Sequence, residues 1–276
     1  YWSFAGMFKP LIDAKLVLEL NKAEFAKNGY LAGALESNVY NNKLYGVPLT
    51  ADLWVIYYNK ALFKEAGVAV PTTYEDLIAS VAKFKAKGII PMVTDGKDAW
   101  PLAITFDNLA QRVSGDFTLV QKALDRKAKF TDASFVQAAK LLQQMVTSGL
   151  FAEDLMVSPY GASRNMFGQG KAAMYLMGAW EVGLATDPNF SDEFKANVDA
   201  FKFPVLKNGK GKIDDLMAWY GGNLFVNATS KNSAMGVKYL QFLAKRWPTL
   251  AWEKGAGYPA QKVAARDSDT VLAKTL

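Results

Sequence analysis

The chain has 276 residues, 51% of them hydrophobic and 21% charged, and it contains neither cysteine nor histidine. The lack of cysteine excludes disulfides, thiol nucleophiles and zinc–cysteine sites, and the lack of histidine excludes the commonest general base and every Ser–His or Cys–His nucleophile system. The net charge of +6 comes from lysines scattered among acidic residues, which favours a solvated surface over a nucleic-acid-binding face.

The first quarter of the chain alternates predicted helices and strands. We expect a helix over residues 11–20 and a short strand over residues 43–48. Residues 53–58 form the strongest predicted strand, because β-branched and aromatic residues there are nearly continuous in apolarity. A short helix over residues 61–66 should end at Gly67.

The next helix begins after Pro71. Thr72 is placed to cap its N-terminus, and Glu75, three residues on, completes the pattern of a capping box. A strand is expected over residues 89–93, and helices over residues 101–113 and 133–147, the second with a clear apolar stripe.

Strands are expected over residues 171–177, 197–205 and 222–226. The last predicted helix is capped by Asn232 and runs to Arg246. Because helices and strands alternate throughout, with no repeat or flexible linker, the fold class is α/β. The length allows one large domain or two ordinary ones.

The segment FGQGKAAMYLMGAW, residues 167–180, looks at first like a phosphate-binding loop. That loop requires G-x-x-x-x-G-K-[ST] before a helix. Here Asn165 replaces the first glycine, Ala172 replaces the serine or threonine, and a strand follows. We interpret the segment as a turn into a strand.

Aromatic residues make up 13% of the chain, and several tryptophans lie where predicted elements end. Rings at element ends can face a cleft, where the apolar side of a sugar packs well on them. Trp54 lies within a strand and is expected in the core. The tryptophans at element ends or beside turns are Trp2, Trp100, Trp180 and Trp219.

Two carboxylates are candidates for polar contacts with a ligand. Asp52 precedes the strand that contains Trp54, and Asp95 lies in a turn. A glycoside hydrolase would need such a pair to be separated by about 5–10 Å, which the sequence does not give. The alternative for each residue is a helix cap, a turn residue or a surface charge.

Together these segments resemble the extracellular solute-binding proteins of ABC sugar importers, the maltose-binding-protein-like family 1. Residues 167–180 match F-x-x-G-x-A-A-M…G-x-W, and residues 44–60 resemble the family's first crossing between lobes. Residues 71–77 resemble its P-x-T-W-x-E-L helix start, with Tyr74 in place of the tryptophan. The likeness runs nearly from end to end.

The resemblance implies a periplasmic-binding-protein-like (type II) pair of α/β lobes around a hinged ligand cleft. Residues 1–50 and 222–276 would form part of lobe one, and residues 51–221 lobe two. The hinge would be the crossings at residues 48–52 and 203–221. Compared with the family the chain looks like a fragment, lacking the N-terminal part of lobe one and the C-terminal helices.

The implied function is capture of a carbohydrate, with an oligosaccharide as the expected class, by hinge closure and its delivery to ABC permease subunits. By position in the family, the resemblance assigns ligand contacts to Trp2, Asp52, Asp95, Trp100 and Trp180. Trp219 and Tyr220, at the second crossing, are added as a further expectation of our own. Residues 3–6 lack the charged pair of maltodextrin binders, so a specificity for maltose is not expected.

No catalytic residue, metal or cofactor is expected, and neither is nucleic-acid binding. The protein is expected outside the cell or in the periplasm. Its only expected membrane association is a lipid anchor outside this chain, as in a lipoprotein. Two alternatives remain at this point: a glycoside hydrolase that uses Asp52 and Asp95, and a structural or adhesive surface protein with no small ligand.

Overall fold

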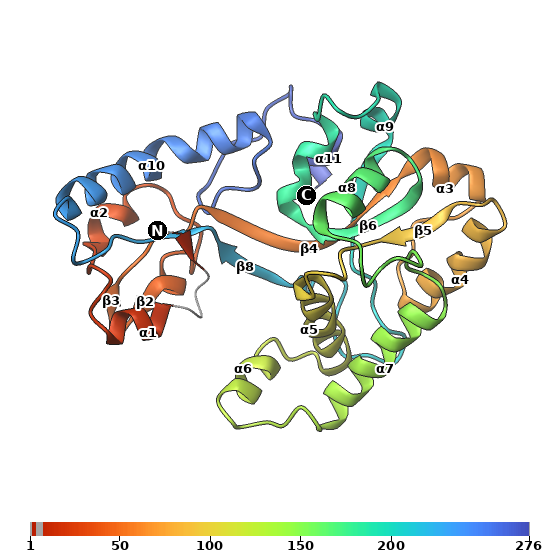
Figure 1. Ribbon diagram of the computed structural model, residues 1–276, viewed down its shortest axis with the longest axis horizontal. Coiled ribbons are helices and arrows are strands. Elements are labelled where there is room, and N and C mark those ends of the chain that lie inside the picture. The colour runs from red at the N-terminus through yellow and green to blue at the C-terminus, as the bar shows by residue number, and fades with distance from the viewer. Residues whose placement is uncertain (1, 4–7, 276) are drawn as a thin grey trace. The chain divides into compact units, whose positions relative to one another are not determined.

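The computed structural model describes residues 2–3 and 8–275, with side chains from Phe8 onward. The described chain forms two compact units (Figure 1). Unit 1 consists of Tyr1–Leu53, Ala179–Gly183 and Ala218–Asp269, and unit 2 of Trp54–Gly178, Leu184–Met217 and Thr270–Leu276. Whether these units are the two lobes, with the boundaries expected above, stays a prediction.

Unit 2 is built around the sheet β5-β6-β4-β7. Strand β4 covers Thr50–Asn59, and its residues from Trp54 onward pair antiparallel with β6 (Ala172–Gly178) and β7 (Val198–Lys202). Strand β5 (Ile90–Val93) lies parallel to β6. All residues of β6 are buried, as expected for a central strand with both faces covered.

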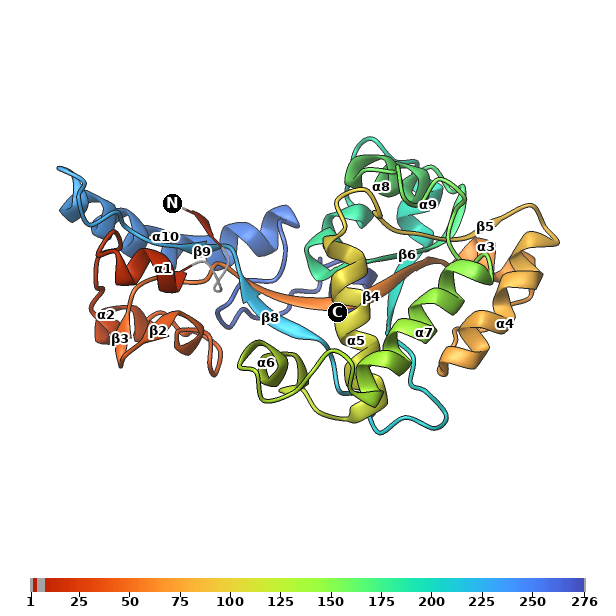
Figure 2. The ribbon, with the colours of Figure 1, turned by 60° about the horizontal axis from the view of Figure 1, so that its bottom comes forward.

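Helices cover both faces of this sheet. In Figures 1 and 2, α8 and α9 lie on one side of it and α5 and α7 on the other. The helices of unit 2 are α3 (Lys60–Ala66), α4 (Tyr74–Lys85), α5 (Trp100–Ser114), α6 (Leu119–Leu124), α7 (Ala133–Thr147), α8 (Tyr160–Gly168), α9 (Asp192–Asn197) and α11 (Val271–Thr275).

Unit 1 contains short paired strands and one long helix, α10 (Ser233–Lys254). Strand β8 (Ala218–Gly221) pairs antiparallel with the first residues of β4. The other elements are β1 (Trp2–Ser3) paired with β9 (Asn223–Leu224), β2 (Val39–Tyr40) paired with β3 (Lys43–Leu44), α1 (Phe8–Asp13), α2 (Lys22–Ala26) and the 3-10 helices η2 (Glu36–Asn38) and η3 (Ala179–Ala185).

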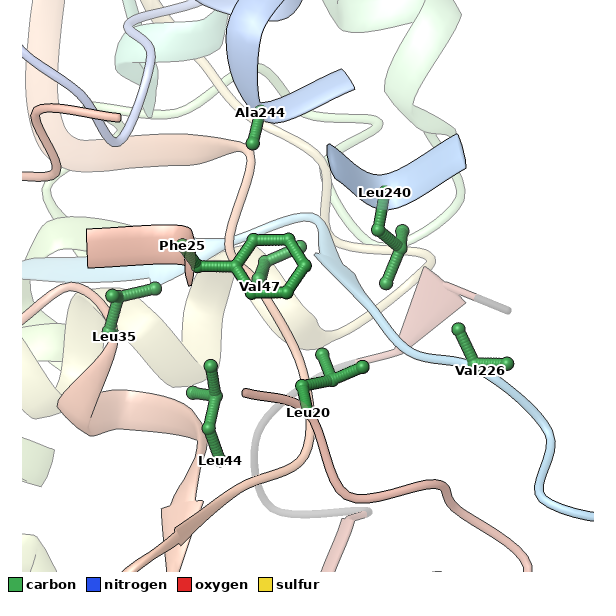
Figure 3. Close-up of a cluster of buried hydrophobic side chains, with 8 residues drawn as sticks. All are labelled: Leu20, Phe25, Leu35, Leu44, Val47, Val226, Leu240 and Ala244. Carbon is green, nitrogen blue, oxygen red and sulfur yellow. The ribbon is translucent and has the colours of Figure 1, made fainter. Parts of the chain in front are cut away.

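A cluster of aliphatic side chains around Phe25 holds unit 1 together (Figure 3). Phe25 of α2 is fully buried, and Leu240 and Ala244 bring α10 onto the same cluster. The apolar surface removed from water by such a cluster is the main stabilising contribution. The remaining buried members are Leu20, Leu35, Leu44, Val47 and Val226.

Most of the expected elements are confirmed. The strong strand predicted over residues 53–58 is the middle of β4, and the predicted amphipathic helix over residues 133–147 coincides with α7. The segment with the apparent phosphate loop is a turn into β6, with Gly170 in the left-handed region at φ 70°.

The helix predicted over residues 11–20 is wrong. Helix α1 ends at Asp13, and Lys15 adopts φ 57°, which breaks the helix. Val17 and Leu20 then form isolated β-bridges with Asn227 and Leu44. Val17 and Leu20 are buried in this non-helical segment, whose backbone forms hydrogen bonds with distant parts of unit 1.

Three further boundaries differ from the prediction. The N-cap of α4 is Thr73, whose hydroxyl accepts a hydrogen bond from the Asp76 backbone N–H at 3.2 Å, so the cap lies one residue after Thr72. Of the strand predicted over residues 222–226, only β9 (Asn223–Leu224) is observed. The preceding strand, β8, was not predicted. Helix α10 continues past Arg246 to Lys254.

Candidate ligand-binding site

A buried carboxylate lies where β4 and β8 pair in unit 1. Asp52 is directly opposite Trp219, and its side chain is only 6% exposed. One carboxylate oxygen accepts a hydrogen bond from the Thr50 hydroxyl at 2.9 Å, and the other has no partner in the described part of the chain. Burial raises the pKa of Asp52 to about 6, against the opposing effect of the Thr50 hydrogen bond.

The close approach of β8 to this carboxylate depends on Gly221. Gly221 pairs with Thr50, two residues before Asp52 on the same strand face. A side chain at residue 221 would collide with the Asp52 carboxylate and press against the Thr50 hydroxyl. Glycine therefore leaves the space that the acid occupies.

Two tryptophans from distant parts of the sequence meet in the same unit. Trp180 lies in η3 directly after β6, and Trp219 lies in β8. Their ring centroids are 5.8 Å apart, with the planes at 62°, an edge-to-face pair. Both side chains are half-buried, so each retains exposed ring surface. The backbone of Gly257 passes close to Trp180.

A pocket of about 650 Å³ is lined by Asp52, Trp219, Tyr220, Tyr258 and Lys262, among other unit 1 residues. The Tyr220 hydroxyl donates a hydrogen bond to the carbonyl oxygen of Ala32 at 2.8 Å, which fixes the ring. The volume is within the range of small-molecule sites, about 300–1,000 Å³. The unit thus combines aromatic surface with one acidic acceptor.

Unit 2 contains the other two described candidates. Asp95 is fully buried after β5, and one of its oxygens accepts a hydrogen bond from the Asp98 backbone N–H at 3.1 Å. Burial is the main cause that raises its pKa. Trp100 begins α5, and its ring lies 6.1 Å from that of Trp54 and 6.2 Å from that of Tyr160.

The structure thus brings together four of the seven expected contact residues in unit 1, namely Asp52, Trp180, Trp219 and Tyr220. The backbone of Trp2 pairs with Leu224 in the same unit, but its side chain lies outside the described part. Trp54 is fully buried, as expected of a core residue.

Sequence reasoning did not identify Thr50, Gly221 or Tyr258 as parts of this site. Thr50 and Gly221 had a usable signal: a hydroxyl two residues from the acid, and a glycine doublet at the second crossing. Tyr258 had none, since it follows a long helix in a segment without a recognisable motif.

Within residues 2–3 and 8–275, no group of three acidic residues is placed to hold a metal ion. No helix in this part of the chain combines the length and apolarity needed to cross a membrane.

Comparison with known proteins identifies the class. The model of the bacterial extracellular solute-binding protein family matches residues 1–246, so the chain belongs to this family. The expected type II periplasmic-binding fold is confirmed by solved structures. One, from a study of xylan utilization by the thermophilic bacterium Caldanaerobius polysaccharolyticus, has a TM-score of 0.90 at 33% identity, covering 99% of this chain and 70% of that one.

Another solved structure, a chitin oligosaccharide binding protein, has a TM-score of 0.84 at 22% identity and covers 96% of this chain and 67% of that one, which supports the fold alone. Among curated proteins, the multiple sugar-binding protein of Streptococcus mutans is 32% identical over 220 residues, 76% of this chain and 48% of that protein. The galactooligosaccharide-binding protein of Bacillus subtilis is 26% identical over 265 residues, 91% of this chain and 58% of that protein. The chain thus spans about half the length of these relatives.

These relatives are binding proteins, and the glycoside hydrolase alternative finds no support among them.

Proposed function

We propose that this chain belongs to the substrate-binding component of an ABC importer that captures a carbohydrate, of the oligosaccharide class, outside the cell or in the periplasm. The observation that carries the proposal is the group of Trp180, Trp219 and Asp52 in a chain of this family. The sugar-binding names of the relatives support the ligand class, and permease subunits are the proposed partners.

The chemistry of the group suits a sugar. The half-buried rings of Trp180 and Trp219 offer flat apolar surface to the C–H face of a pyranose. The Asp52 oxygen without a protein partner is itself buried, so in this proposal the neighbouring side chains shift when the sugar binds and a sugar hydroxyl then donates to that oxygen. A ligand without that hydroxyl would leave the acid unsatisfied, which gives the site strong discrimination.

The remaining expected contacts, Trp2, Asp95 and Trp100, are part of the same proposal. Capture would proceed by hinge closure at residues 48–52 and 203–221. The ligand can drive that closure only by binding the closed form more tightly than the open form.

The test is calorimetric titration with a panel of oligosaccharides, including xylan-derived and galactose-containing sugars. Trp180→Ala should weaken the binding of the best ligand about tenfold, because a stacked ring contributes ~1 kcal/mol or more. Trp180→Phe should restore part of the loss. Phe117→Ala, which removes an exposed ring of unit 2, is the control and should bind normally.

Two results would refute the proposal. One is the absence of heat and of thermal stabilisation with every sugar of the panel. The other is the appearance of shortened products after incubation, which would establish hydrolysis in place of capture.

A further inference from the structure

The turn between β5 and α5 in unit 2, residues 94–99, contains Asp95 and leads directly to Trp100, two of the expected ligand contacts. Its backbone is strained at Ala99, which is not a glycine but adopts φ 61° and ψ −30°. Strained residues of this kind persist only where the surrounding structure fixes them, and they cluster at functional sites. The contacts around the turn therefore help to set the place of Trp100.

Two buried serines hold the first residue of the turn. Ser163 of α8 is 1% exposed, and its hydroxyl donates to the carbonyl oxygen of Thr94 at 2.9 Å. Because a hydroxyl has a single proton, Ser158 is the donor in the 3.1 Å hydrogen bond between the Ser158 and Ser163 hydroxyls. The Thr94 hydroxyl donates to the carbonyl oxygen of Leu176 in β6 at 2.9 Å. Thr94 is thus tied to both α8 and β6.

The remainder of the turn lies against the segment that precedes α8. The Gly96 backbone approaches the carbonyl oxygen of Leu155 so closely that a side chain at residue 96 would collide with it. The Lys97 backbone N–H donates to the carbonyl oxygen of Ser158 at 3.4 Å. Helix α8 in turn packs against β5 and β6 (Figure 1). Ser158 therefore contacts the turn with its backbone and supports Ser163 with its hydroxyl.

We propose that Ser158 and Ser163, which we call the serine clamp, are positioning residues for ligand binding. They hold the turn in the conformation that presents the half-buried Trp100 ring to a sugar, without touching the sugar themselves. A turn that is fixed in advance does not have to be ordered when the ligand binds, so less entropy is lost and the affinity is higher. This inference rests on the function proposed above.

A buried serine of another helix separates this role from a general contribution to the fold. Ser80 of α4 is 4% exposed, and its hydroxyl donates to the carbonyl oxygen of Leu77 at 2.6 Å, within the same helix. The Ser163 hydroxyl instead joins α8 to a turn that lies 69 positions earlier in the chain. Ser80→Ala is therefore the matched control for Ser163→Ala.

The test compares Ser163→Ala, Ser158→Ala and Ser80→Ala with the wild type. Calorimetric titration with xylotetraose and with raffinose measures the affinity, and mass spectrometry measures hydrogen exchange of the backbone amides of residues 95–100. Ser158→Ala keeps the hydrogen bond from Ser163 to Thr94, so it is the milder variant and serves if Ser163→Ala does not fold. Circular dichroism checks the fold of each variant.

Ser163→Ala should bind the sugar about three- to tenfold more weakly than the wild type, because the turn must then be ordered on binding. Its amides over residues 95–100 should exchange about tenfold faster, while those of α4 keep their wild-type rates. Ser158→Ala should change both quantities in the same direction and by less. Ser80→Ala should match the wild type in both.

Wild-type affinity in Ser163→Ala and Ser158→Ala would overturn the proposal. An equal loss of affinity in Ser80→Ala would also overturn it, because the loss would then follow from removing any buried hydroxyl. A wild type that binds neither sugar would count against the proposed function instead. The exchange of residues 95–100 would then decide alone whether the serines hold the turn, and wild-type rates in Ser163→Ala would show that they do not.

Discussion

The hydroxyl of Thr50 donates a 2.9 Å hydrogen bond to the carboxylate of Asp52, and this is the only hydrogen bond that the described side chains or backbone give to that buried acid. A single neutral donor does not replace the hydration that the ionised carboxylate loses on burial. The pKa of Asp52 therefore rises to about 6 from 3.8.

This rise makes folding stability depend on pH. Between pH 3.8 and about 6 the folded chain holds a proton on Asp52 that the unfolded chain has released, so stability falls as pH rises through this window. Asp52→Asn removes the titrating group and keeps an oxygen for the Thr50 hydroxyl. We expect the variant to be more stable than the wild type by up to about 3 kcal/mol at pH 8.

The measurement is denaturant unfolding of both proteins at pH 8 and at pH 4. The difference in the free energy of unfolding between the two proteins should be smaller at pH 4, where Asp52 of the wild type is protonated. A constant difference at both pH values would contradict the role given to Asp52. Asp107, whose pKa burial also raises to about 6, is present in both proteins and cancels in the comparison.

Gly221→Ala should destabilise the protein by about 1–3 kcal/mol, because the new methyl group collides with the Asp52 carboxylate and overpacking costs that much. Gly161→Ala in α8 is the matched control. Nothing lies near its added methyl group, and alanine is the better helix former, so this variant should be as stable as the wild type or slightly more stable. Urea unfolding measures both.

The source of the Gly221 effect can be isolated with a double variant. Combining Gly221→Ala with Asp52→Ala removes the colliding carboxylate. The loss of unfolding free energy caused by Gly221→Ala should therefore be smaller by about half or more in the Asp52→Ala background than in the wild type. Such a coupling is expected of residues in contact. Full additivity of the two changes would show that the strain arises elsewhere.

The sequence was sufficient for elements whose signal is local. The continuous apolarity of β4 and β6 and the stripe of α7 depend only on neighbouring residues, and each was predicted within a few positions. The order of the remaining helices and strands was also predicted from local patterns, and the resemblance to the family agreed with it. The helix prediction was wrong in the region of Val17 and Leu20, because the backbone partners of this apolar run lie far along the chain.

The candidate site likewise has features with a local sequence signal and features without one. Trp180 became a candidate because it closes a recognisable motif, and Asp52 because it precedes a strong predicted strand. The proximity of Trp180 to Trp219 and the register that sets Asp52 opposite Trp219 depend on strand pairing between distant segments, which no local pattern encodes.

The N-cap of α4 gives a prediction that separates two adjacent threonines. Thr73→Ala removes the hydroxyl that accepts from the Asp76 N–H and donates to the Asp76 carboxylate at 2.6 Å. We expect the free energy of unfolding to fall by about 1 kcal/mol, which is typical for the removal of an N-cap side chain. Thr72→Ala is the control. Its exposed side chain does not cap the helix, so its thermal unfolding should match the wild type, and a larger loss at residue 72 than at residue 73 would contradict the assignment.

Arg112 of α5 is fully buried, and its guanidinium donates to backbone carbonyl oxygens of a single segment, those of Phe203 at 2.7 Å, Pro204 at 3.2 Å, and Lys212 and Asp215 at 2.6 Å each. Burial lowers the pKa of Arg112.

Arg112→Met keeps the apolar length of the side chain but leaves these carbonyl oxygens without their donor. We expect a loss of about 3–5 kcal/mol in the free energy of unfolding, as when one partner of a buried charged group is removed. The exposed Lys140→Met on α7 should change it by less than about 0.5 kcal/mol. Guanidinium unfolding of the three proteins measures these losses, and similar values for the two variants would show that the segment from Phe203 to Asp215 holds its conformation without Arg112.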